Sequence, residues 1–190
     1  QDPNIIMVGE IRDSETADIS VQAALTGHLV LSTLHTNDAP SAIPRLFDMK
    51  VEPFLAAAVL NSILAQRLVR KICLDCIESY KISAEIAATI KNQMKNLGLD
   101  SAGYSVPKIL YRGRGCNVCG QIGYRGRMGI YEIFDVDEEM RTAIVDPKFT
   151  LDSIRKILRK KNFLTMFEDG LRKAERGLTT VEEVLRVIRE

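Results

Sequence analysis

The sequence predicts an α/β fold that carries a cysteine-bearing insertion and a helical C-terminal part. Two short apolar runs, at 5–8 and 28–34, flank a stretch of helical character. The four cysteines form two Cys-x-x-Cys pairs in the middle of the chain. Beyond residue 136, apolar side chains recur at the three- and four-residue spacing of amphipathic helices.

The first apolar run, IIMV, is short and flanked by polar residues, which is typical of a strand buried in a parallel sheet. A helix is expected next, over 14–26, because Asp13 or Ser14 can cap its start and Gly27 can end it. The second run, HLVLSTL, predicts another buried strand. The crossover of such a strand–helix–strand unit is right-handed almost without exception.

Polar side chains follow both strands. Glu10 comes shortly after the first strand, and His35 comes directly after the second. The carboxyl ends of parallel strands meet at one edge of an open sheet, where ligands bind. Glu10 is then an ordinary exposed carboxylate, a salt-bridge partner, or the carboxylate that orients Mg²⁺ and an attacking water in a nucleoside triphosphatase. His28 precedes the second strand and is expected to make a local hydrogen bond at the helix end.

Two further helices are expected over 38–49 and 53–72. The second is apolar nearly all round and should therefore be buried on most sides. Arg67 and Arg70 would lie on it and could pair with phosphate, although basic residues are favoured near a helix C-terminus in any case.

The composition changes between the two cysteine pairs, where glycine and arginine become frequent. Apolar residues at helical spacing over 86–97 indicate a helix there, and a strand is expected over 128–136. In the tail, Thr180 and Glu183 would form a capping box for the last helix. We therefore divide the chain into a sheet-containing part, a cysteine-bearing subdomain, and a strand with amphipathic helices, at 1–72, 73–127 and 128–190.

The cysteine pairs are Cys73 with Cys76 and Cys116 with Cys119. Four thiolates in two such knuckles suit a tetrahedral Zn²⁺ ion with bonds of about 2.3 Å. Disulfides are not expected in a reducing compartment, and free thiols or a redox pair are the alternatives to zinc. Four sulfur ligands leave no open coordination position, so the metal would fold the subdomain and take no part in chemistry.

Four arginines surround the second cysteine pair: Arg112, Arg114, Arg125 and Arg127. They form a solvated basic hairpin, a docking patch for a protein, or a contact for nucleic-acid phosphates, the last being the least expected. The net charge of +1 implies no global field that would favour nucleic acid or an acidic membrane. No apolar stretch approaches the roughly 20 residues that span a bilayer, and no secretion leader opens the chain, so a cytoplasmic location is expected.

Several long motifs occur in order: GEIRDSETADI, ALTGHLVLSTLHTNDA, AQRLVRKIC, and the cysteine pairs with YRGRMGIYEIF. Over nearly the whole chain they resemble the motor ATPases of bacterial type II secretion and type IV pilus assembly. The resemblance implies the C-terminal part of a RecA-like P-loop core, with the tetracysteine zinc subdomain of the assembly-type motors. Transport of a secreted protein and assembly of a pilus both fit this pattern.

The resemblance also implies roles for residues. Glu10 resembles the Walker B carboxylate that acts through Mg²⁺ and water on ATP, and His35 resembles the histidine that senses the γ-phosphate. Arg67 is the expected additional contact for the nucleotide. The complete protein would be a homo-hexamer that acts on an inner-membrane platform protein from the cytoplasmic side. The alternatives are a zinc-stapled module that binds protein or nucleic acid, and a structural adaptor.

The sequence departs from the family pattern in one respect. A Gly-x-x-x-x-Gly-Lys-Ser/Thr loop, which cradles phosphates, occurs nowhere in the 190 residues. In the family this loop and the arginine fingers precede the Walker B strand. We therefore expect the chain to be a C-terminal piece of a longer motor, and to hydrolyse ATP negligibly by itself.

Overall fold

The computed structural model describes residues 3–98 and 106–189. The strands are β1 (Ile5–Val8), β2 (Leu29–Ser32), β3 (Ser62–Ile72), β4 (Ile77–Lys81), β5 (Ile109–Gly113) and β6 (Tyr124–Asp135). The helices are α1 (Ser14–Leu25), α2 (Ala42–Asp48), α3 (Pro53–Val59), α4 (Ala84–Asn96), α5 (Glu138–Val145), α6 (Leu151–Lys160), α7 (Met166–Glu175) and α8 (Val181–Arg189), with 3₁₀ helices η1 (Leu74–Cys76) and η2 (Asn117–Cys119). These elements gather into two compact units, unit 1 (Gln1–Ala65 and Glu132–Phe163) and unit 2 (Gln66–Tyr131 and Leu164–Glu190).

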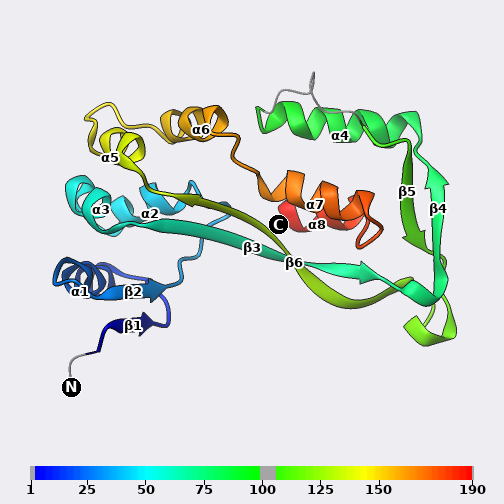
Figure 1. The fold of residues 1–190 in the computed structure, drawn as a ribbon, viewed down its shortest axis with the longest axis horizontal. Helices are drawn as coiled ribbons and strands as arrows, with labels where there is room; N and C mark the ends of the chain where they lie inside the picture. The colour runs from blue at the N-terminus through cyan, green and yellow to red at the C-terminus, as the bar shows by residue number, and fades with distance from the viewer. Residues whose placement is uncertain (1–2, 99–105, 190) are drawn as a thin grey trace. The chain divides into compact units, whose positions relative to one another are not determined.

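Unit 1 contains the predicted strand–helix–strand arrangement (Figure 1). β1 and β2 pair in parallel, with Ile5 opposite Leu29. α1 connects them and begins at Asp13, whose carboxylate accepts a hydrogen bond from the Thr16 N–H at 2.8 Å. This cap satisfies one of the backbone donors that a helix start leaves without a partner. The expectations for residues 5–34 are therefore confirmed in element type and order.

The expected burial of these two strands is not observed within the described residues. β1 and β2 pair only with each other there, and Met7 is 81% exposed. Ile5, Leu29 and Leu31 are also exposed. A buried parallel strand needs other elements packed over both of its faces, and within the described residues these side chains lack such cover.

One apolar core in unit 1 joins α1, α2, α3, α5 and α6 to the end of β6. Two aromatic pairs pack edge-on within it, Phe47 with Phe149 and Phe134 with Phe163, at ring-centroid separations of 5.1 and 5.8 Å. Such pairs add to the stabilisation that burial of apolar area provides. The loops that follow β1 and β2 therefore lie against this packed core.

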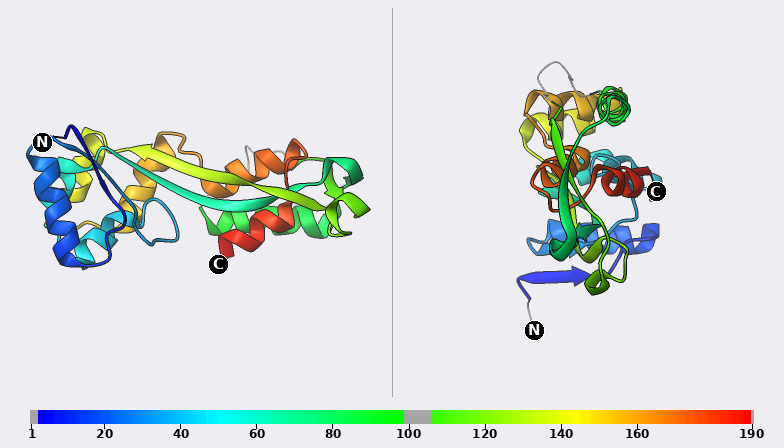
Figure 2. Two further views of the ribbon diagram at one scale, coloured as in Figure 1. Left: turned by 90° about the horizontal axis from the view of Figure 1, so that it is seen from below. Right: turned by 90° about the vertical axis from the view of Figure 1, so that its right-hand side faces the viewer.

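The prediction of one helix over 53–72 is wrong for the second half of this segment. α3 ends at Val59, and β3 begins at Ser62 and pairs with β6 (Figures 1 and 2). Exposure alternates with a period of two along most of β3, and Val69 is fully buried. Pairing with β6 overrides the helical propensity of this segment, and both strands are divided between the two units. α2 is also shorter than the helix expected over 38–49.

Unit 2 contains the antiparallel strands β4 and β5 and the helices α4, α7 and α8. β4 and β5 pair antiparallel, with Ile77 opposite Gly113, and α4 follows β4 as the helical spacing over 86–97 predicts. α7 and α8 approach closely at Gly170. A Cβ placed on this residue would lie 2.6 Å from Val184 Cγ1. The predicted fold class, an α/β chain with a tetracysteine insertion and a helical C-terminal part, is confirmed. The division at residues 72 and 127 stays a prediction about domains.

Across residues 3–98 and 106–189, the structure has no helix with the length and apolar character that crossing a membrane requires.

Candidate functional site

The carboxyl ends of β1 and β2 bring Glu10 and His35 together. His35 Nε2 lies 3.0 Å from Glu10 Oε2. Hydrogen bonds between the segments after the two strands hold this edge: Ile11 N–H donates to Thr33 O at 2.9 Å, and the Thr33 hydroxyl donates to Gly9 O at 2.8 Å. The two side chains that follow the strands in the sequence therefore form one pair in unit 1.

Glu10 is an ionised carboxylate within reach of solvent. The hydrogen bond with His35 lowers the pKa of Glu10, and Arg12, whose Nε lies 2.7 Å from Glu10 Oε2, lowers it further against the effect of partial burial. The Glu10 side chain is 36% exposed and that of His35 is 75% exposed. A water molecule or a ligand can therefore approach both groups from solution.

The loop after His35 is held by side chains from distant parts of unit 1. Ala39 N–H donates to Glu132 Oε1 of β6 at 2.6 Å, and the Arg155 guanidinium of α6 donates to Asp38 Oδ2 at 2.8 Å. Glu132 was not predicted as a site residue from the sequence. The available signal was a glutamate at an inward position of β6, where the alternation of exposed and buried residues predicts an apolar side chain.

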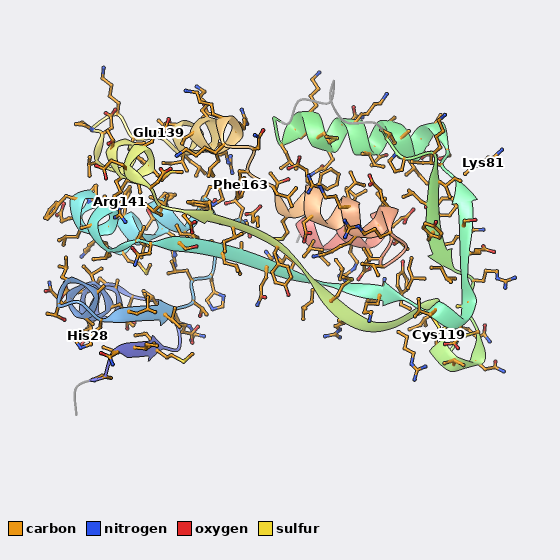
Figure 3. The ribbon with its side chains drawn as sticks, in the orientation of Figure 1. His28, Lys81, Cys119, Glu139, Arg141 and Phe163 are labelled. Atoms are coloured by element: carbon orange, nitrogen blue, oxygen red, sulfur yellow. The ribbon has the colours of Figure 1, made fainter. Side chains whose placement is uncertain are left out.

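The other histidine and the first candidate arginine lie elsewhere. His28 precedes β2, whereas His35 follows it. Nδ1 of His28 (labelled in Figure 3) lies 3.1 Å from Ala23 O, the local contact expected at a helix end. Arg67 is half-buried on β3, not on a helix, and belongs to unit 2. The expected contact of Arg67 with a nucleotide stays a prediction.

Arg70 is engaged in an ion-pair network around the buried Glu183 within unit 2. Its guanidinium donates to Glu183 Oε2 at 2.7 Å and lies 4.2 Å from the centroid of the Tyr124 ring, and Arg186 donates to Glu183 Oε1 at 2.8 Å. Burial disfavours the Glu183 carboxylate, but the hydrogen bonds from Arg186 and Arg70 prevail and lower its pKa to about 2. The Thr180 hydroxyl accepts a hydrogen bond from the Glu183 N–H at 3.2 Å, which is one of the two bonds of the expected capping box. The Glu183 carboxylate, which would make the other bond, binds the arginines.

All four cysteines meet in one cluster in unit 2. Their sulfur atoms lie within 4.8 Å of one another, with Sγ–Sγ distances of 3.9 Å from Cys73 to Cys116, 3.9 Å from Cys76 to Cys119, and 3.7 Å from Cys116 to Cys119. A tetrahedron with Zn–S bonds of about 2.3 Å has edges of about 3.8 Å. These sulfur positions fit a tetrahedral ion.

The backbone around Cys119 favours a thiolate. Cys119 lies next to the end of the paired strands β4 and β5 (Figure 3), and burial disfavours its charged form. The N–H groups of Cys116 and Gly123 donate to its sulfur at 3.3 Å each and lower its pKa to about 6. Gly123 has φ +75°, and a Cβ on Gly113 would lie 2.0 Å from Gly123 O, so the close approach of these segments requires glycine. Burial raises the pKa of Cys73 and Cys76.

Three of the arginines near this cluster pair with carboxylates. Arg112 and Arg114 contact Glu78 at 2.8 and 3.5 Å, and Arg125 contacts Asp75 at 3.9 Å. These pairs neutralise part of the basic charge expected from the sequence. They reduce the field available to attract phosphates.

Comparisons with known proteins agree with this arrangement. Residues 1–186 match the family described as "Type II/IV secretion system protein". The chain is 52% identical over 185 residues to the type IV pilus assembly ATPase PilB of Thermus thermophilus, covering 97% of this chain and 20% of the relative. It is 50% identical over 190 residues to the type II secretion system protein E of Pseudomonas aeruginosa, covering 100% of this chain and 36% of the relative. The chain thus spans about a fifth to a third of the length of these relatives.

Solved structures with the same fold are the ATPase DotB of Legionella pneumophila and the pilus retraction motor PilT with bound ADP. DotB superposes with a TM-score of 0.64 at 21% identity, and the match covers 99% of this chain and 39% of the DotB chain. PilT superposes with a TM-score of 0.62 at 24% identity, and the match covers 98% of this chain and 40% of the PilT chain. The chain therefore has the fold of the matching part of these two structures. By the match along nearly its whole length and the identity to these relatives, the chain belongs to the type II/IV secretion system protein family.

Proposed function

We propose that this chain is part of a motor ATPase that drives type IV pilus assembly or type II secretion, and that Glu10 and His35 belong to its ATP site. The observation that carries the proposal is the 3.0 Å pair at the ends of two neighbouring parallel strands. The relatives named as a pilus assembly ATPase and a secretion protein E support the assignment. Membership of this family favours a motor over a zinc-stapled binding module.

In this site Glu10 would orient the attacking water through its ionised carboxylate and would help to hold Mg²⁺. His35, which contacts Glu10, responds to the presence of the γ-phosphate. When bound, Mg²⁺–ATP supplies the phosphoryl group that is transferred to water. Arg67, on β3, is proposed separately as a contact for a nucleotide phosphate, because a guanidinium suits the geometry of a phosphate. Phosphoryl transfer depends mainly on positioning and charge stabilisation, and a pair fixed by two strands suits that task.

The four cysteines are proposed ligands of one structural Zn²⁺ ion. The support is the set of sulfur separations near 3.8 Å and the N–H donors to Cys119. An ion with four sulfur ligands holds the start of β4 to the end of β5 and leaves no position for a substrate.

The proposal for the complete protein includes its assembly and location. It would act as a homo-hexamer on the cytoplasmic face of the inner membrane and move a platform protein there. The support is the resemblance of the motifs to the assembly-type motors, together with the names of the relatives.

A single substitution tests the assignment of Glu10. In the full-length motor, Glu10→Gln keeps the shape of the side chain but removes the charge that orients water and metal. We expect kcat for ATP hydrolysis to fall by about 100-fold or more, with a much smaller change in nucleotide affinity. Phosphate release and binding of a fluorescent nucleotide measure the two quantities.

Glu15→Gln is the matched control, because Glu15 is an exposed carboxylate in the first turn of α1. It makes the same chemical change close to Glu10 in the sequence and should leave kcat within about 3-fold of the wild type. If Glu10→Gln hydrolysed ATP as fast as this control, the motor assignment of the site would be refuted.

A further inference from the structure

Glu132 is a buried carboxylate that the proposed mechanism does not use. It lies on β6 in unit 1 and is 5% exposed. Its neighbours at the inward positions of the strand, Ile130 and Phe134, are apolar and buried. A carboxylate at such a position is unfavourable unless it is hydrogen-bonded. The groups that bond to Glu132 therefore indicate its role in the fold.

One hydrogen-bond partner of Glu132 is the backbone of the loop that carries His35. Glu132 Oε1 accepts a hydrogen bond of 2.6 Å from the N–H of Ala39, which is itself 1% exposed. A buried backbone N–H without a partner is strongly unfavourable, so this hydrogen bond stabilises the position of residue 39. Residue 39 is four positions beyond His35, which limits the chain between them to roughly 14 Å when fully extended.

A second side chain fixes the same loop from α6. Arg155 donates to Asp38 Oδ2 at 2.8 Å, and the other oxygen of Asp38 accepts from the Ser41 N–H at 2.9 Å. The Thr36 hydroxyl donates to Asp38 O at 3.1 Å. The loop is therefore tied to β6 at residue 39 and to α6 at residue 38, immediately after the segment that places the imidazole.

We propose that Glu132 is a positioning residue, which holds the loop over 33–41 so that His35 stays beside Glu10, with Arg155 as a second anchor through Asp38. The inference rests on the proposed function, because it matters for catalysis only if His35 belongs to the ATP site. Glu132 does not touch the reacting atoms. It acts on the geometry of His35 through the backbone of Ala39.

Kinetics of the full-length motor provide the first test. Glu132→Ala removes the acceptor of the Ala39 N–H, and we expect kcat for ATP hydrolysis to fall by about 10- to 100-fold while KM changes by less than about 3-fold. Glu132→Gln keeps an oxygen that can accept this hydrogen bond and should restore kcat to within about 5-fold of the wild type. Equal loss in both variants, or an effect on KM alone, would overturn the proposal.

Amide hydrogen exchange of the same full-length proteins separates positioning from general destabilisation. Glu132→Ala should accelerate exchange in the peptide that covers 33–41, whereas α1 and α5 of unit 1 should keep the wild-type rate. A uniform acceleration throughout unit 1 would show a purely structural role and refute the inference.

Arg155→Ala tests the second anchor without changing the core, because the Arg155 side chain is 43% exposed. It should accelerate exchange in the 33–41 loop and lower kcat by about 2- to 5-fold. Lys156→Ala, which removes an exposed ion pair with Asp152 on the same helix, is the control and should do neither. Identical behaviour of the two variants would count against the anchor.

The failure of this inference and the failure of the proposed function give different results. If Glu10→Gln and His35→Ala abolish hydrolysis but Glu132→Ala changes neither kcat nor exchange in the loop, only the role of Glu132 is wrong. If Glu10→Gln and His35→Ala leave hydrolysis intact, the proposed ATP site is wrong, and the role of Glu132 falls with it.

Discussion

At the scale of single residues, Glu183 shows how a buried carboxylate makes stability depend on pH. It is 1% exposed, it accepts hydrogen bonds from Arg70 and Arg186, and its pKa is lowered from 4.5 to about 2. A carboxylate whose pKa is lower in the folded state stabilises the fold above its unfolded value. That contribution is lost as the pH falls from 4.5 through about 2.

We predict that Glu183→Gln lowers the free energy of unfolding at pH 7 by about 1–3 kcal/mol. The pKa difference alone corresponds to about 3 kcal/mol, and the partly exposed arginines reduce it through solvent screening. The difference between wild type and variant should shrink as the pH falls below 4.5. Urea denaturation followed by circular dichroism at pH 7, 5 and 3.5 measures it.

The neighbouring Glu182→Gln is the control for this measurement. Glu182 is exposed in the first turn of α8, so the same chemical change should alter the free energy of unfolding by less than about 0.5 kcal/mol. A difference between Glu183→Gln and wild type that stayed constant from pH 7 to 3.5 would contradict the assigned pKa.

Residues at the ends of strands were predictable from the sequence, whereas residues inside strands were not. Glu10 and His35 follow apolar runs, and the rule that parallel strands share a carboxyl edge was enough to bring them together. Glu132 and Arg70 depend on partners that are 93 and 113 residues distant in the chain. No local pattern encodes such a partner, so their roles required the structure.

At the scale of elements, the segment over 53–72 shows the limit of reading secondary structure from a local pattern. Its leucines, alanines and arginines are good helix formers, and its apolar content fits a buried helix. The segment over 62–72 nevertheless forms β3, because β6 offers a pairing edge. The helices of the C-terminal part, which pack through one apolar stripe each, were predictable from periodicity alone.

The contact between α7 and α8 leads to a second prediction. Replacing a glycine inside a helix by alanine normally stabilises the helix by about 1 kcal/mol. At Gly170 we expect the opposite, a loss of about 1–3 kcal/mol, because the new methyl group would lie 2.6 Å from the fully buried Val184. Thermal or urea unfolding of Gly170→Ala measures the change.

A double-mutant cycle identifies the cause of that loss. Val184→Ala leaves space next to Gly170, so the two substitutions together should be less destabilising than the sum of the single effects by about 1 kcal/mol or more. Simple additivity would show that the close approach of α7 and α8 is not what requires glycine at this position.

At the scale of the whole molecule, the tetracysteine cluster connects segments that lie far apart in the sequence. Cys73 and Cys76 precede β4, and Cys116 and Cys119 follow β5. A bound Zn²⁺ ion would therefore close β4, β5 and the chain between them into one loop. Closing a long loop restricts the unfolded chain, and the binding energy of a structural ion adds to the free energy of unfolding.

We predict that the purified chain holds about one zinc ion, and that chelation at neutral pH loosens unit 2 selectively. Amide exchange should accelerate in β4, β5 and the two cysteine knuckles, while the core of unit 1 keeps its protection. Elemental analysis and hydrogen exchange measure the two effects. A chelator saturated with zinc beforehand is the control, and chelation that loosened both units equally would contradict the prediction.

The chain is also expected to be inactive by itself, although it contains Glu10 and His35. Hydrolysis of a nucleoside triphosphate requires groups that cradle the phosphates and stabilise the charge of the transition state, and the 190 residues hold no loop of the Gly-x-x-x-x-Gly-Lys-Ser/Thr type. We predict that its ATP turnover is at least about 1000-fold below that of the full-length motor, since charge-stabilising groups alone contribute factors of this size. Release of phosphate, measured under identical conditions, gives the ratio.

Two controls make that comparison decisive. The exposed apolar side chains of β1 and β2, such as Met7, invite association between chains, so the assay should be made on material shown by light scattering to be monomeric. Glu10→Gln in the same 190-residue chain then separates its own activity from that of a contaminant, because only the former depends on the carboxylate. A turnover within about 10-fold of the full-length motor that Glu10→Gln abolished would show that the strand ends suffice for catalysis without the phosphate loop.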